Sequence, residues 1–388
     1  MALKRGDHAA GQASLSSLAH IPMRVLHTEW STGWGGQEIR ILAEMKGLRA
    51  RGVEFFLACR AGAKIGAAAE RENFTVFEIP FRGSFHPPSI FRLKRLIHEH
   101  RIDIVNTHSG KDSWNGGLAA KLAGARFVRT RHLYFKPTPL QMLWINRRAD
   151  FVVTTGESLR EHMIRDSRVR PDHIVSIPTG QNPEVYDPRR YDRAAERARL
   201  GIPADAIAVG MLAMFRRVKG TNLYLQMAEQ LAARYPQAVF LIAGDGPQSE
   251  EINQFIRDRG LGARILRVGY LPQTAPYLLA LDIFVLPSLM EGLPQTLIQA
   301  LMLERACVAT DVGSVHELLN DNFLMIEPGS LQAVTEAVSR LLADRALTER
   351  LAGRARASVI ERYGEQRMLD DMLEVYRRVM RGGSSRDH

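Results

Sequence analysis

One segment of this 388-residue chain, Ile283–Leu319, constrains the fold more than any other. It begins with the short apolar run Ile283–Leu286, which is typical of a strand buried on both faces. Pro294 lacks a backbone donor and fits the start of a helix, here from Gln295 to about Leu303. A second apolar run, Ala306–Thr310, predicts the next buried strand. Strand, loop, helix and strand in this order predict an α/β domain with a parallel sheet.

The loop before the predicted helix carries the chemistry of this segment. The backbone amides of Gln295, Thr296 and Leu297 are the free donors of a helix N-terminus, which carries about half a positive charge and suits a phosphate. Glu291, just before the helix, suits hydroxyl groups better than a further phosphate. A nucleotide-sugar carries hydroxyl groups beside phosphates. We therefore expect the loop between this strand and this helix to bind a nucleotide-sugar.

Several residues of the segment resemble one known family. The run Pro287-Ser288-x-x-Glu291-Gly292-x-Pro294, the turn Ala309-Thr310-x-x-Gly313 and the later Glu317 are similar to the donor-site segment of retaining GT-B glycosyltransferases of the family 4 type. The resemblance implies an α/β GT-B fold, in which two Rossmann-like domains face each other across a cleft. It also implies transfer of a sugar from a nucleotide-diphosphate sugar, with retention of the anomeric configuration.

The resemblance assigns roles to individual residues of the segment. Glu291 would orient the donor sugar during catalysis. The family has a second glutamate, associated with the donor ribose, where this chain has Gln299, whose amide can still bond a hydroxyl. The donor-binding residues implied here are Glu291, Gly292, Leu293, Pro294, Thr296, Leu297 and Gln299.

A cationic loop follows the predicted strand Ala206–Leu212 in the second half. Lys219 stands just before a helix and can reach a diphosphate as a point charge, which the resemblance also implies, together with a catalytic role. The family has an arginine at the place of Met214, so we expect Arg216 or Arg217 to reach in from the same loop. Further donor-binding residues implied by the resemblance are Gly246, in a turn after the next strand, and Tyr270 and Leu271, near the nucleobase.

The first half opens with a glycine-rich turn between a predicted strand and a helix at Gln37–Arg49. Such a turn lets a ligand approach the backbone closely. It does not match the GxGxxG pattern, which disfavours a dinucleotide cofactor. Gly35-Gly36-x-Glu38 resembles the family's N-domain glycine loop, so Gly35 and Gly36 are implied to bind donor and Glu38 to bind acceptor.

His108 follows the predicted strand Ile102–Asn106, at the carboxyl end where open α/β sheets place ligands. In the family, a histidine at this strand end faces the donor sugar, and we expect a catalytic role for His108. A neighbouring predicted strand, Phe127–His132, leaves basic groups at its tip. Arg129, Arg131 and His132 are therefore candidates for binding the acceptor.

The pattern divides the chain into four parts. We expect a loose tail over residues 1–21, an acceptor domain over 22–185 and a nucleotide-sugar donor domain over 186–365, because Pro183, Pro188 and a charged run mark a boundary near residue 185. In this fold the last helix, within residues 366–388, crosses back to the N-terminal domain.

The net charge of +10 comes from the first half of the chain. Residues Met1–Gly180 hold 27 lysines and arginines against 16 acidic residues, and the remainder holds 25 against 26. Leu133–Arg148 interleaves aromatic with cationic residues, and a predicted helix within Pro87–Arg101 has a basic face. Such surfaces suit nucleic acid, an anionic membrane or a phosphorylated acceptor, charge alone does not choose between them, and many basic faces are merely solvated. Together with the resemblance, the basic first half leads us to expect a glycolipid or oligosaccharide acceptor, as in lipopolysaccharide or capsule assembly, and peripheral contact with the inner membrane face.

Other classes are disfavoured by simple features of the sequence. The N-terminus lacks the apolar core of a secretory signal, and no run approaches a membrane span, so a cytoplasmic protein is expected. Cys59 and Cys307 are predicted to be buried and unpaired. We expect no cofactor and no metal, because a helix N-terminus and Lys219 can neutralise a departing diphosphate.

Three alternatives remain open from the sequence. Met214 and Gln299 make a non-catalytic nucleotide-sugar-binding homologue conceivable. A nucleotide-sugar epimerase shares the two-domain plan. A nucleic-acid binder is the least favoured, because the basic half has glycine turns at strand ends rather than a recognised reading motif.

Overall fold

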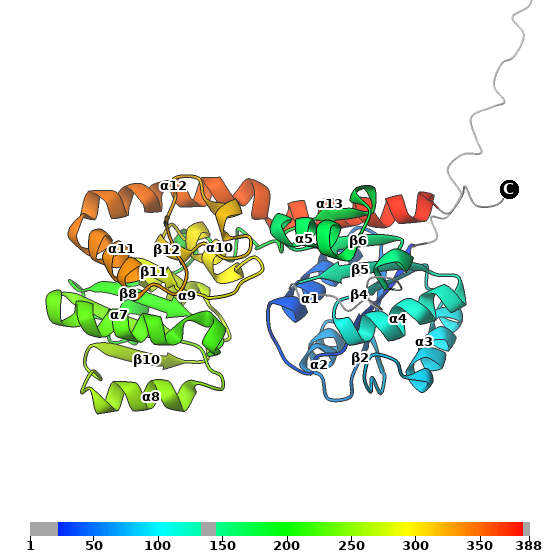
Figure 1. Cartoon of the computed structure of the whole chain (residues 1–388), viewed down its shortest axis with the longest axis horizontal. Helices are drawn as coiled ribbons and strands as arrows, with labels where there is room; N and C mark the ends of the chain where they lie inside the picture. The colour runs from blue at the N-terminus through cyan, green and yellow to red at the C-terminus, as the bar shows by residue number, and fades with distance from the viewer. Residues whose placement is uncertain (1–21, 133–144, 383–388) are drawn as a thin grey trace, which may run out of the picture.

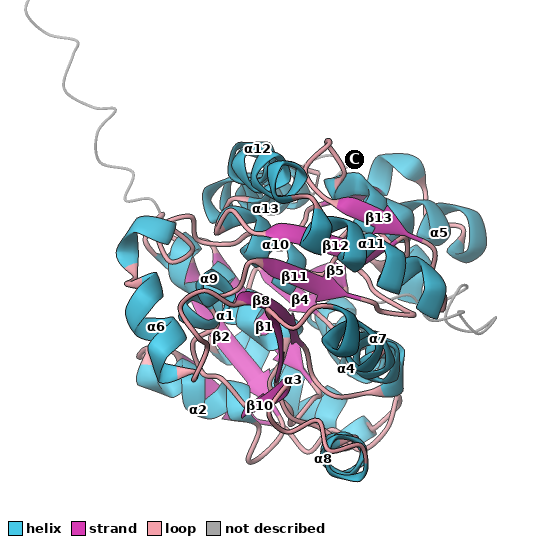
Figure 2. Cartoon of the chain, turned by 90° about the vertical axis from the view of Figure 1, so that its left-hand side faces the viewer, coloured by secondary structure: helices cyan, strands magenta, loops and turns pink. Residues whose placement is uncertain are grey.

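The computed structural model describes residues 22–132 and 145–382. Two α/β lobes lie side by side, and each has a parallel sheet between layers of helices (Figure 1). Viewed toward the second lobe, the strands lie in the middle and the helices outside (Figure 2). Both predicted parallel sheets are therefore present. The predicted tail at 1–21 and most of the aromatic-basic run, residues 133–144, lie outside the described part.

The first sheet has seven strands in the order β3-β2-β1-β4-β5-β6-β7, all paired in parallel. Its strands are β1 (Arg24–Glu29), β2 (Glu54–Cys59), β3 (Thr75–Glu78), β4 (Ile104–Thr107), β5 (Arg126–Arg131), β6 (Phe151–Thr154) and β7 (Ile174–Ser176). Its connecting helices are α1 (Gly36–Arg49), α2 (Lys64–Arg71), α3 (Pro87–Glu99), α4 (Gly110–Ala123) and α5 (Glu157–Ser167). Successive strand residues face opposite sides, so Val25 and Leu26 enter two different apolar cores.

The second sheet has six strands in the order β10-β9-β8-β11-β12-β13, again all parallel. Its strands are β8 (Ile207–Leu212), β9 (Ala238–Ala243), β10 (Ile265–Gly269), β11 (Ile283–Leu286), β12 (Ala306–Thr310) and β13 (Leu324–Ile326). Its helices are α7 (Thr221–Arg234), α8 (Ser249–Asp258), α9 (Ala275–Ala280), α10 (Gln295–Met302), α11 (Leu331–Ala343) and α12 (Arg345–Tyr363). After Gly313 the chain forms only the short 3₁₀ turn η5 (Val315–Leu318), and Leu319 returns to extended backbone.

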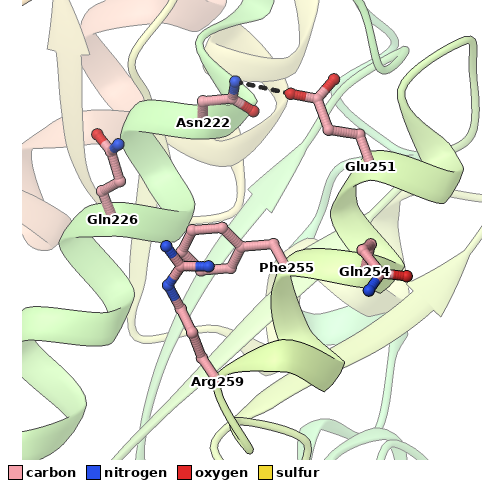
Figure 3. Close-up of a pocket in the computed structure, with 6 residues that line it drawn as sticks. All are labelled: Asn222, Gln226, Glu251, Gln254, Phe255 and Arg259. Atoms are coloured by element: carbon pink, nitrogen blue, oxygen red, sulfur yellow. Dashed lines mark hydrogen bonds between the residues drawn. The ribbon is translucent and has the colours of Figure 1, made fainter.

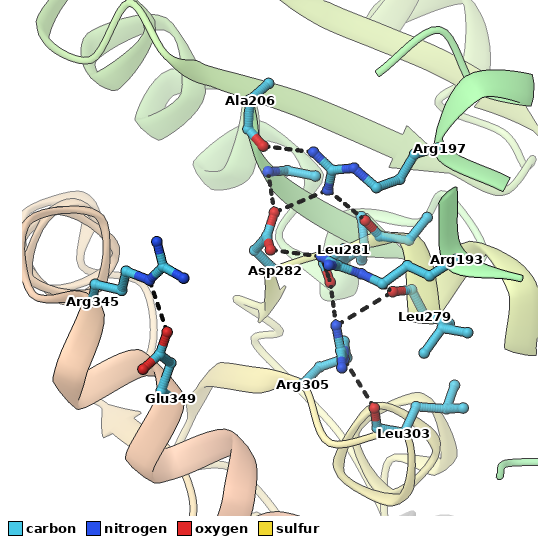
Figure 4. Close-up of polar contacts among 12 residues, drawn as sticks. Arg193, Arg197, Ala206, Leu279, Leu281, Asp282, Leu303, Arg305, Arg345 and Glu349 are labelled. Atoms are coloured by element: carbon cyan, nitrogen blue, oxygen red, sulfur yellow. Dashed lines mark hydrogen bonds and ion pairs between the residues drawn. The ribbon is translucent and has the colours of Figure 1, made fainter. Parts of the chain in front are cut away.

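The segment between the lobes is anchored at the base of the second sheet. Helix α6 (Arg193–Arg199) contributes two arginines to the carboxylate of Asp282, which precedes β11 (Figure 4). Arg193 Nη2 lies 2.6 Å from Oδ1 and Arg197 Nη1 3.1 Å from Oδ2. The backbone amide of Ala208 also donates to Oδ2, at 2.8 Å. Because Asp282 joins α6 to β8 and β11, the interdomain segment is fixed to the second lobe.

The last helix, α13 (Glu365–Arg381), leaves the second lobe and packs on the first (Figure 1). Met368, Leu369, Met372 and Tyr376 lie in the same apolar core as the strands and α1 of the first sheet. The hydroxyl of Tyr376 accepts a hydrogen bond from Asn106 Nδ2 of β4, at 2.9 Å. The first lobe is therefore completed by residues from the end of the chain.

Two further expectations concern cysteines and membranes. Cys59 and Cys307 are both buried and free, as predicted. Among the described helices, none is both long and apolar enough to cross a bilayer.

Candidate active site

Three loops meet at the carboxyl edge of the second sheet, after β8, β11 and β12. Lys219, at the end of the 3₁₀ turn η4 (Arg217–Lys219), places Nζ 2.8 Å from both carboxylate oxygens of Glu291. Ser288 Oγ donates to Oε1 of the same carboxylate, at 2.7 Å. The loop after β8 and the loop after β11 are also joined through the backbone, because Leu289 N donates to Val218 O at 2.8 Å. The predicted cation and the predicted carboxylate therefore form one ion pair.

Glycines allow these loops to approach so closely. Gly220 has φ +69°, and a Cβ there would lie 1.9 Å from the carbonyl oxygen of Pro287. Gly313 has φ +58°, and a Cβ there would lie 2.2 Å from the carbonyl oxygen of Glu291. Both positions combine a left-handed backbone with contact against another backbone, which excludes other residues. The three loops thus hold Lys219 and Glu291 in fixed positions.

Helix α10 begins at Gln295, shortly after the loop that carries Glu291, with Pro294 as its N-cap. The backbone hydrogen bond at the start of the helix runs from Ile298 N to Pro294 O, at 3.4 Å. The amides of Gln295, Thr296 and Leu297, which precede Ile298, therefore lack an acceptor within the helix. Thr296 is half-buried, whereas Leu293, Pro294 and Leu297 are buried. Lys219, Glu291 and the N-terminus of α10 therefore all lie at the carboxyl edge of the second sheet.

Gln299 lies on α10 but bonds to protein groups. Its Nε2 donates to Gln181 Oε1 at 2.9 Å, and its Oε1 accepts from Thr274 Oγ1 at 3.1 Å. Gln181 also donates to Gln295 Oε1, at 3.3 Å. The structure therefore joins Gln299 to the interdomain segment, a role that the sequence did not reveal.

The remaining predicted donor residues lie around the same edge. Met214, Arg216 and Arg217 are exposed, and so is Tyr270, whereas Leu271 packs on an apolar core. Gly246 lies against the backbone of Phe215, where a Cβ would be 2.7 Å from its carbonyl oxygen. Sequence reasoning missed Arg267 of β10, whose guanidinium lies 4.6 Å from the Phe215 ring and donates to Gly244 O at 2.8 Å. A lone arginine within a strand gave no signal for this position.

The glycine loop of the first lobe faces α10 of the second. A Cβ on Gly36 would lie 2.2 Å from Gln295 Nε2, so the N-terminal ends of α1 and α10 touch. Gly35 N donates to Glu38 Oε2 at 2.8 Å, and Glu38 therefore caps its own helix. The structure thus brings Gly35 and Gly36 to the donor loops and uses the Glu38 carboxylate locally.

His108 is held between two other histidines. Its Nε2 lies 2.7 Å from Nδ1 of His27, and its Nδ1 lies 3.1 Å from Nε2 of His132. His108 is 1% exposed, and burial, followed by the neighbouring histidines, holds its pKa well below the ordinary value. Both ring nitrogens of His108 are therefore occupied by protein groups, whereas the half-buried His132 lies at the outer end of the row.

The two predicted acceptor arginines on β5 are buried. Arg129 donates to Asn146 Oδ1, and burial, followed by the charge of Arg131, holds its pKa well below the ordinary value. Burial also lowers the pKa of Arg131. Both arginines are therefore buried at the carboxyl end of β5, and Arg131 is only 8% exposed.

A buried carboxyl that the sequence did not single out lies at the end of β1. Glu29 accepts from Ser31 N at 2.7 Å and from Gln37 Nε2. Burial, followed by the nearby charge of Asp112, raises its pKa to about 8. Burial therefore favours the protonated form of Glu29 near neutral pH, and its 0% exposure places it beneath the surface of this edge.

Glu317 connects the two lobes. Its Oε1 accepts from the backbone amides of Glu157 at 2.8 Å and Ser158 at 3.2 Å, at the start of α5. Ser158 Oγ donates in return to Gly313 O, at 2.9 Å. A residue that the sequence matched to a donor-site motif therefore caps a helix of the opposite lobe.

A separate pocket of about 340 Å³ lies on the surface of the second lobe, between α7 and α8 (Figure 3). It is lined by Asn222, Gln226, Glu251, Gln254, Phe255 and Arg259, and it contains none of the predicted site residues. Within the described residues, no group of three or more histidines, cysteines or acidic residues is placed to hold a metal ion.

Family models match both lobes of the chain. A model described as Glycosyltransferase Family 4 matches residues 34–185, and one described as Glycosyl transferases group 1 matches residues 192–358. The boundary between the two matches falls in the segment between the two sheets.

Individual proteins agree with these models. The lipopolysaccharide core biosynthesis glycosyltransferase LpsE of Rhizobium meliloti is 25% identical over 365 residues, covering 91% of this chain and 98% of LpsE. An Escherichia coli UDP-Gal:alpha-D-GlcNAc-diphosphoundecaprenol alpha-1,3-galactosyltransferase is 25% identical over 304 residues, covering 74% of this chain and 78% of that protein. The crystal structure of Anabaena Alr3699/HepE in complex with UDP matches with a TM-score of 0.81 and 20% identity, covering 91% and 99% of the two chains.

The two parallel sheets and the match to HepE define a two-domain α/β fold of the GT-B class. With matches to both of its lobes, the chain belongs to the family 4 type of GT-B glycosyltransferases.

Proposed function

We propose that this enzyme transfers a sugar from a nucleotide-diphosphate sugar to a hydroxyl of a glycolipid or oligosaccharide, with retention of anomeric configuration. The observation that carries the proposal is the Lys219–Glu291 ion pair at the N-terminus of α10, opposite Gly36. A cation, free amides and a carboxylate in one place suit a diphosphate joined to a sugar. Similar proteins act on or bind such molecules, including HepE, which was solved with UDP-glucose.

In this mechanism the protein stabilises the leaving group. The bond between the anomeric carbon and the diphosphate oxygen breaks, and Lys219 and the amides of Gln295 and Thr296 offset the charge that develops on the diphosphate. These donors need no metal ion for that task. Lys219 must exchange part of its contact with Glu291 for the phosphate, which leaves the Glu291 carboxylate to accept bonds from sugar hydroxyls.

The acceptor oxygen bonds to the anomeric carbon on the face that the diphosphate leaves. Its proton passes to an oxygen of the departing diphosphate, so the nucleoside diphosphate carries it away. Glu291 orients the sugar and does not act as a nucleophile. His132 lies at the facing edge of the first lobe, keeps some exposure and is the group available to the acceptor.

An exposed aromatic and basic surface on the first lobe supports contact with an anionic membrane. Phe85, in the loop before α3, is 62% exposed and Phe91 of α3 is 66% exposed, and Arg92 and Arg95 of the same helix are exposed too. The N-terminus of α3 lies at the carboxyl edge of the sheet, the same edge that carries His108. Such a surface would bring the acceptor site close to lipid-linked saccharides.

The reaction is tested by incubating the purified chain with UDP-, GDP- and ADP-sugars and a lipid extract. We expect one donor to raise the melting temperature, since a ligand at 100 times its Kd adds about 2.7 kcal/mol. That donor should release nucleoside diphosphate only with acceptor, give a product of unchanged anomeric configuration, and remain active in EDTA. An inverted product would exclude retention, and an altered free nucleotide-sugar without acceptor would indicate an epimerase.

The membrane contact is tested by sedimentation with vesicles. We expect binding to vesicles rich in anionic lipid, weaker binding to neutral vesicles, and a clear loss in Phe85→Ser/Phe91→Ser. Leu122→Ser, which changes an exposed apolar residue of α4, is the control. Equal binding of both variants would contradict a role for the α3 surface.

A further inference from the structure

Three histidines of the first lobe form a continuous hydrogen-bonded row across three adjacent strands. His27 lies on β1, His108 follows β4 and His132 follows β5, and these strands are neighbours in the sheet. The contacts are 2.7 Å from His27 Nδ1 to His108 Nε2 and 3.1 Å from His108 Nδ1 to His132 Nε2. The row uses both ring nitrogens of His108 and joins the interior of the lobe to its outer edge.

Each ring of the row is neutral at physiological pH. Burial and the charge of Arg40 lower the pKa of His27 to about 3, and burial is also the main cause of the low pKa of His108 and His132. A neutral imidazole has one nitrogen that donates and one that accepts. Since every bond in the row needs one of each, all three protons must point in the same direction along it.

Glu44 of α1 decides that direction. Its Oε1 lies 3.6 Å from His27 Nε2, which makes no hydrogen bond within the described residues. Tyr376 accepts a bond from Asn106 Nδ2, and its hydroxyl proton points to Oε1 of Glu44. Oε1 is thus an acceptor whether or not Glu44 is ionised, and a lone pair on His27 Nε2 would face it unfavourably. The proton of His27 is therefore on Nε2.

The remaining protons follow from this one. With the His27 proton on Nε2, the 2.7 Å contact would have His27 Nδ1 accepting from His108 Nε2, and the 3.1 Å contact would have His108 Nδ1 accepting from His132 Nε2. Nδ1 of His132 is then left with a lone pair, and within the described residues it makes no hydrogen bond to the protein. His132 is the ring of the row that keeps some exposure, at the edge that carries the glycine loop.

We propose that Glu44 and His27 are positioning residues that fix His132 as a hydrogen-bond acceptor through His108, so that a substrate hydroxyl donates to its Nδ1. Neither Glu44 nor His27 reaches the surface, because both are fully buried. The contact with a substrate hydroxyl rests on the proposed glycosyl transfer, whereas the order of protons along the row does not. The two parts can therefore fail separately.

The proton order is measured by nuclear magnetic resonance of protein labelled with ¹⁵N in histidine rings, without substrate. We expect His27, His108 and His132 all to be neutral and protonated on Nε2. A cationic ring, or a proton on Nδ1 of His132, would overturn the proposal even if the enzyme is fully active. Absence of any glycosyl transfer alongside the expected proton order would instead refute the proposed function.

Variants then test whether Glu44 acts through the row. Glu44→Met removes the acceptor at nearly constant volume, and we expect mixed protonation of His132 with kcat lower by about 3- to 10-fold, the equivalent of one neutral hydrogen bond, and KM for donor little changed. Glu44→Gln is the matched control, since it keeps an acceptor oxygen that Tyr376 bonds and that faces His27, and it should leave the His132 proton on Nε2.

A second variant, His27→Phe, tests the same positioning role independently, in case Glu44→Met does not fold. His27→Phe keeps a ring stacked on Phe55, whose centroid lies 5.3 Å from that of His27, but removes the acceptor for His108. It should change the protonation of His132 in the same way as Glu44→Met. An unchanged His132 proton and an unchanged kcat in a folded variant of either kind would overturn the positioning role.

Discussion

The two edges that face each other in this enzyme keep their charges in different ways. On the second lobe, Lys219 and Glu291 belong to loops and meet as a single ion pair, with 28% and 7% of their side chains exposed. On the first lobe, His27, Glu29, His108 and Asp112 are essentially fully buried and arise from different strands and a helix. We call the carboxyl edges of the first and second sheets the first and second edge. At the second edge, Lys219 can exchange Glu291 for a charged ligand. At the first edge, burial fixes which side chains hold protons.

In the proposed reaction, this difference would let one site serve two chemically unlike substrates, a diphosphate and a sugar hydroxyl. A diphosphate brings its own charge and needs a cation held in place, and charged groups interact strongly across short distances. A sugar hydroxyl is neutral, so it is recognised by whether the group opposite donates or accepts. Burial provides that control because it fixes protonation states.

The largest expected effect comes from removing the cation of the second edge. Lys219→Ala should lower kcat/KM by about 10²- to 10³-fold, the usual loss when one group that stabilises developing negative charge is removed. Steady-state release of nucleoside diphosphate measures this effect. Arg234→Ala, a cation at the opposite end of α7, is the control and should retain activity. Similar losses in both variants would contradict a specific role for Lys219.

Next in size is the effect of the glycine that joins the loops. Gly220→Ala should destabilise the fold by about 3 kcal/mol, because a left-handed backbone and an overlap with Pro287 O add to one another. Chemical denaturation provides the measurement. Gly36→Ala should cost less than about 1 kcal/mol, since its Cβ meets only the flexible end of Gln295. Gly353→Ala, in the middle of α12 with nothing within 4 Å, is the control and should stabilise the fold by about 1 kcal/mol.

The pH dependence of stability tests the first edge. Glu29 has a pKa raised from 4.5 to about 8, so the folded state binds its proton more tightly than the unfolded state. Its contribution is complete below pH 4.5 and is lost as the pH rises through about 8. Between pH 6 and pH 8 the loss should be about 2 kcal/mol, and Glu29→Gln should remove it. Urea unfolding at both pH values would show the difference, and the exposed Glu78→Gln should behave like the parent protein.

The smallest expected effect is a gain at the second edge. Met214 is 40% exposed and stands where the family has a diphosphate-binding arginine. Met214→Arg should lower the KM for donor by about 3- to 10-fold, as one charge-assisted bond at a partly exposed site would. Val218→Arg adds the same charge on the same loop and serves as the control. An equal gain from Val218→Arg would mean that Met214 marks no specific phosphate position.

The second edge could be predicted from the sequence because its parts lie on continuous segments. Glu291, Pro294 and the start of α10 are close in the chain, and strand, loop and helix boundaries follow from local pattern. Lys219 was found from its place after a strand. The ion pair between Lys219 and Glu291 was not predicted, because it depends on how closely Gly220 lets the two loops approach.

The first edge was predicted only in part. His108 was recognised as a residue after a strand, but its contacts with His27 and His132 depend on strand order in three dimensions. Glu29 and Glu44 look in the sequence like ordinary carboxylates. Their burial results from the packing of helices on the sheet, including one from the far end of the chain, which local pattern does not reveal.

That far-end helix has a consequence for synthesis. On the ribosome the first lobe is made before α13, yet Met372 and Tyr376 of α13 belong to its core. Until the second lobe has been translated, the nascent first lobe has an uncovered apolar surface, and Asn106 Nδ2 lacks its partner Tyr376. The first lobe can complete its core only after α13 has left the ribosomal exit tunnel, so chains truncated before α13 should be recognised as unfinished.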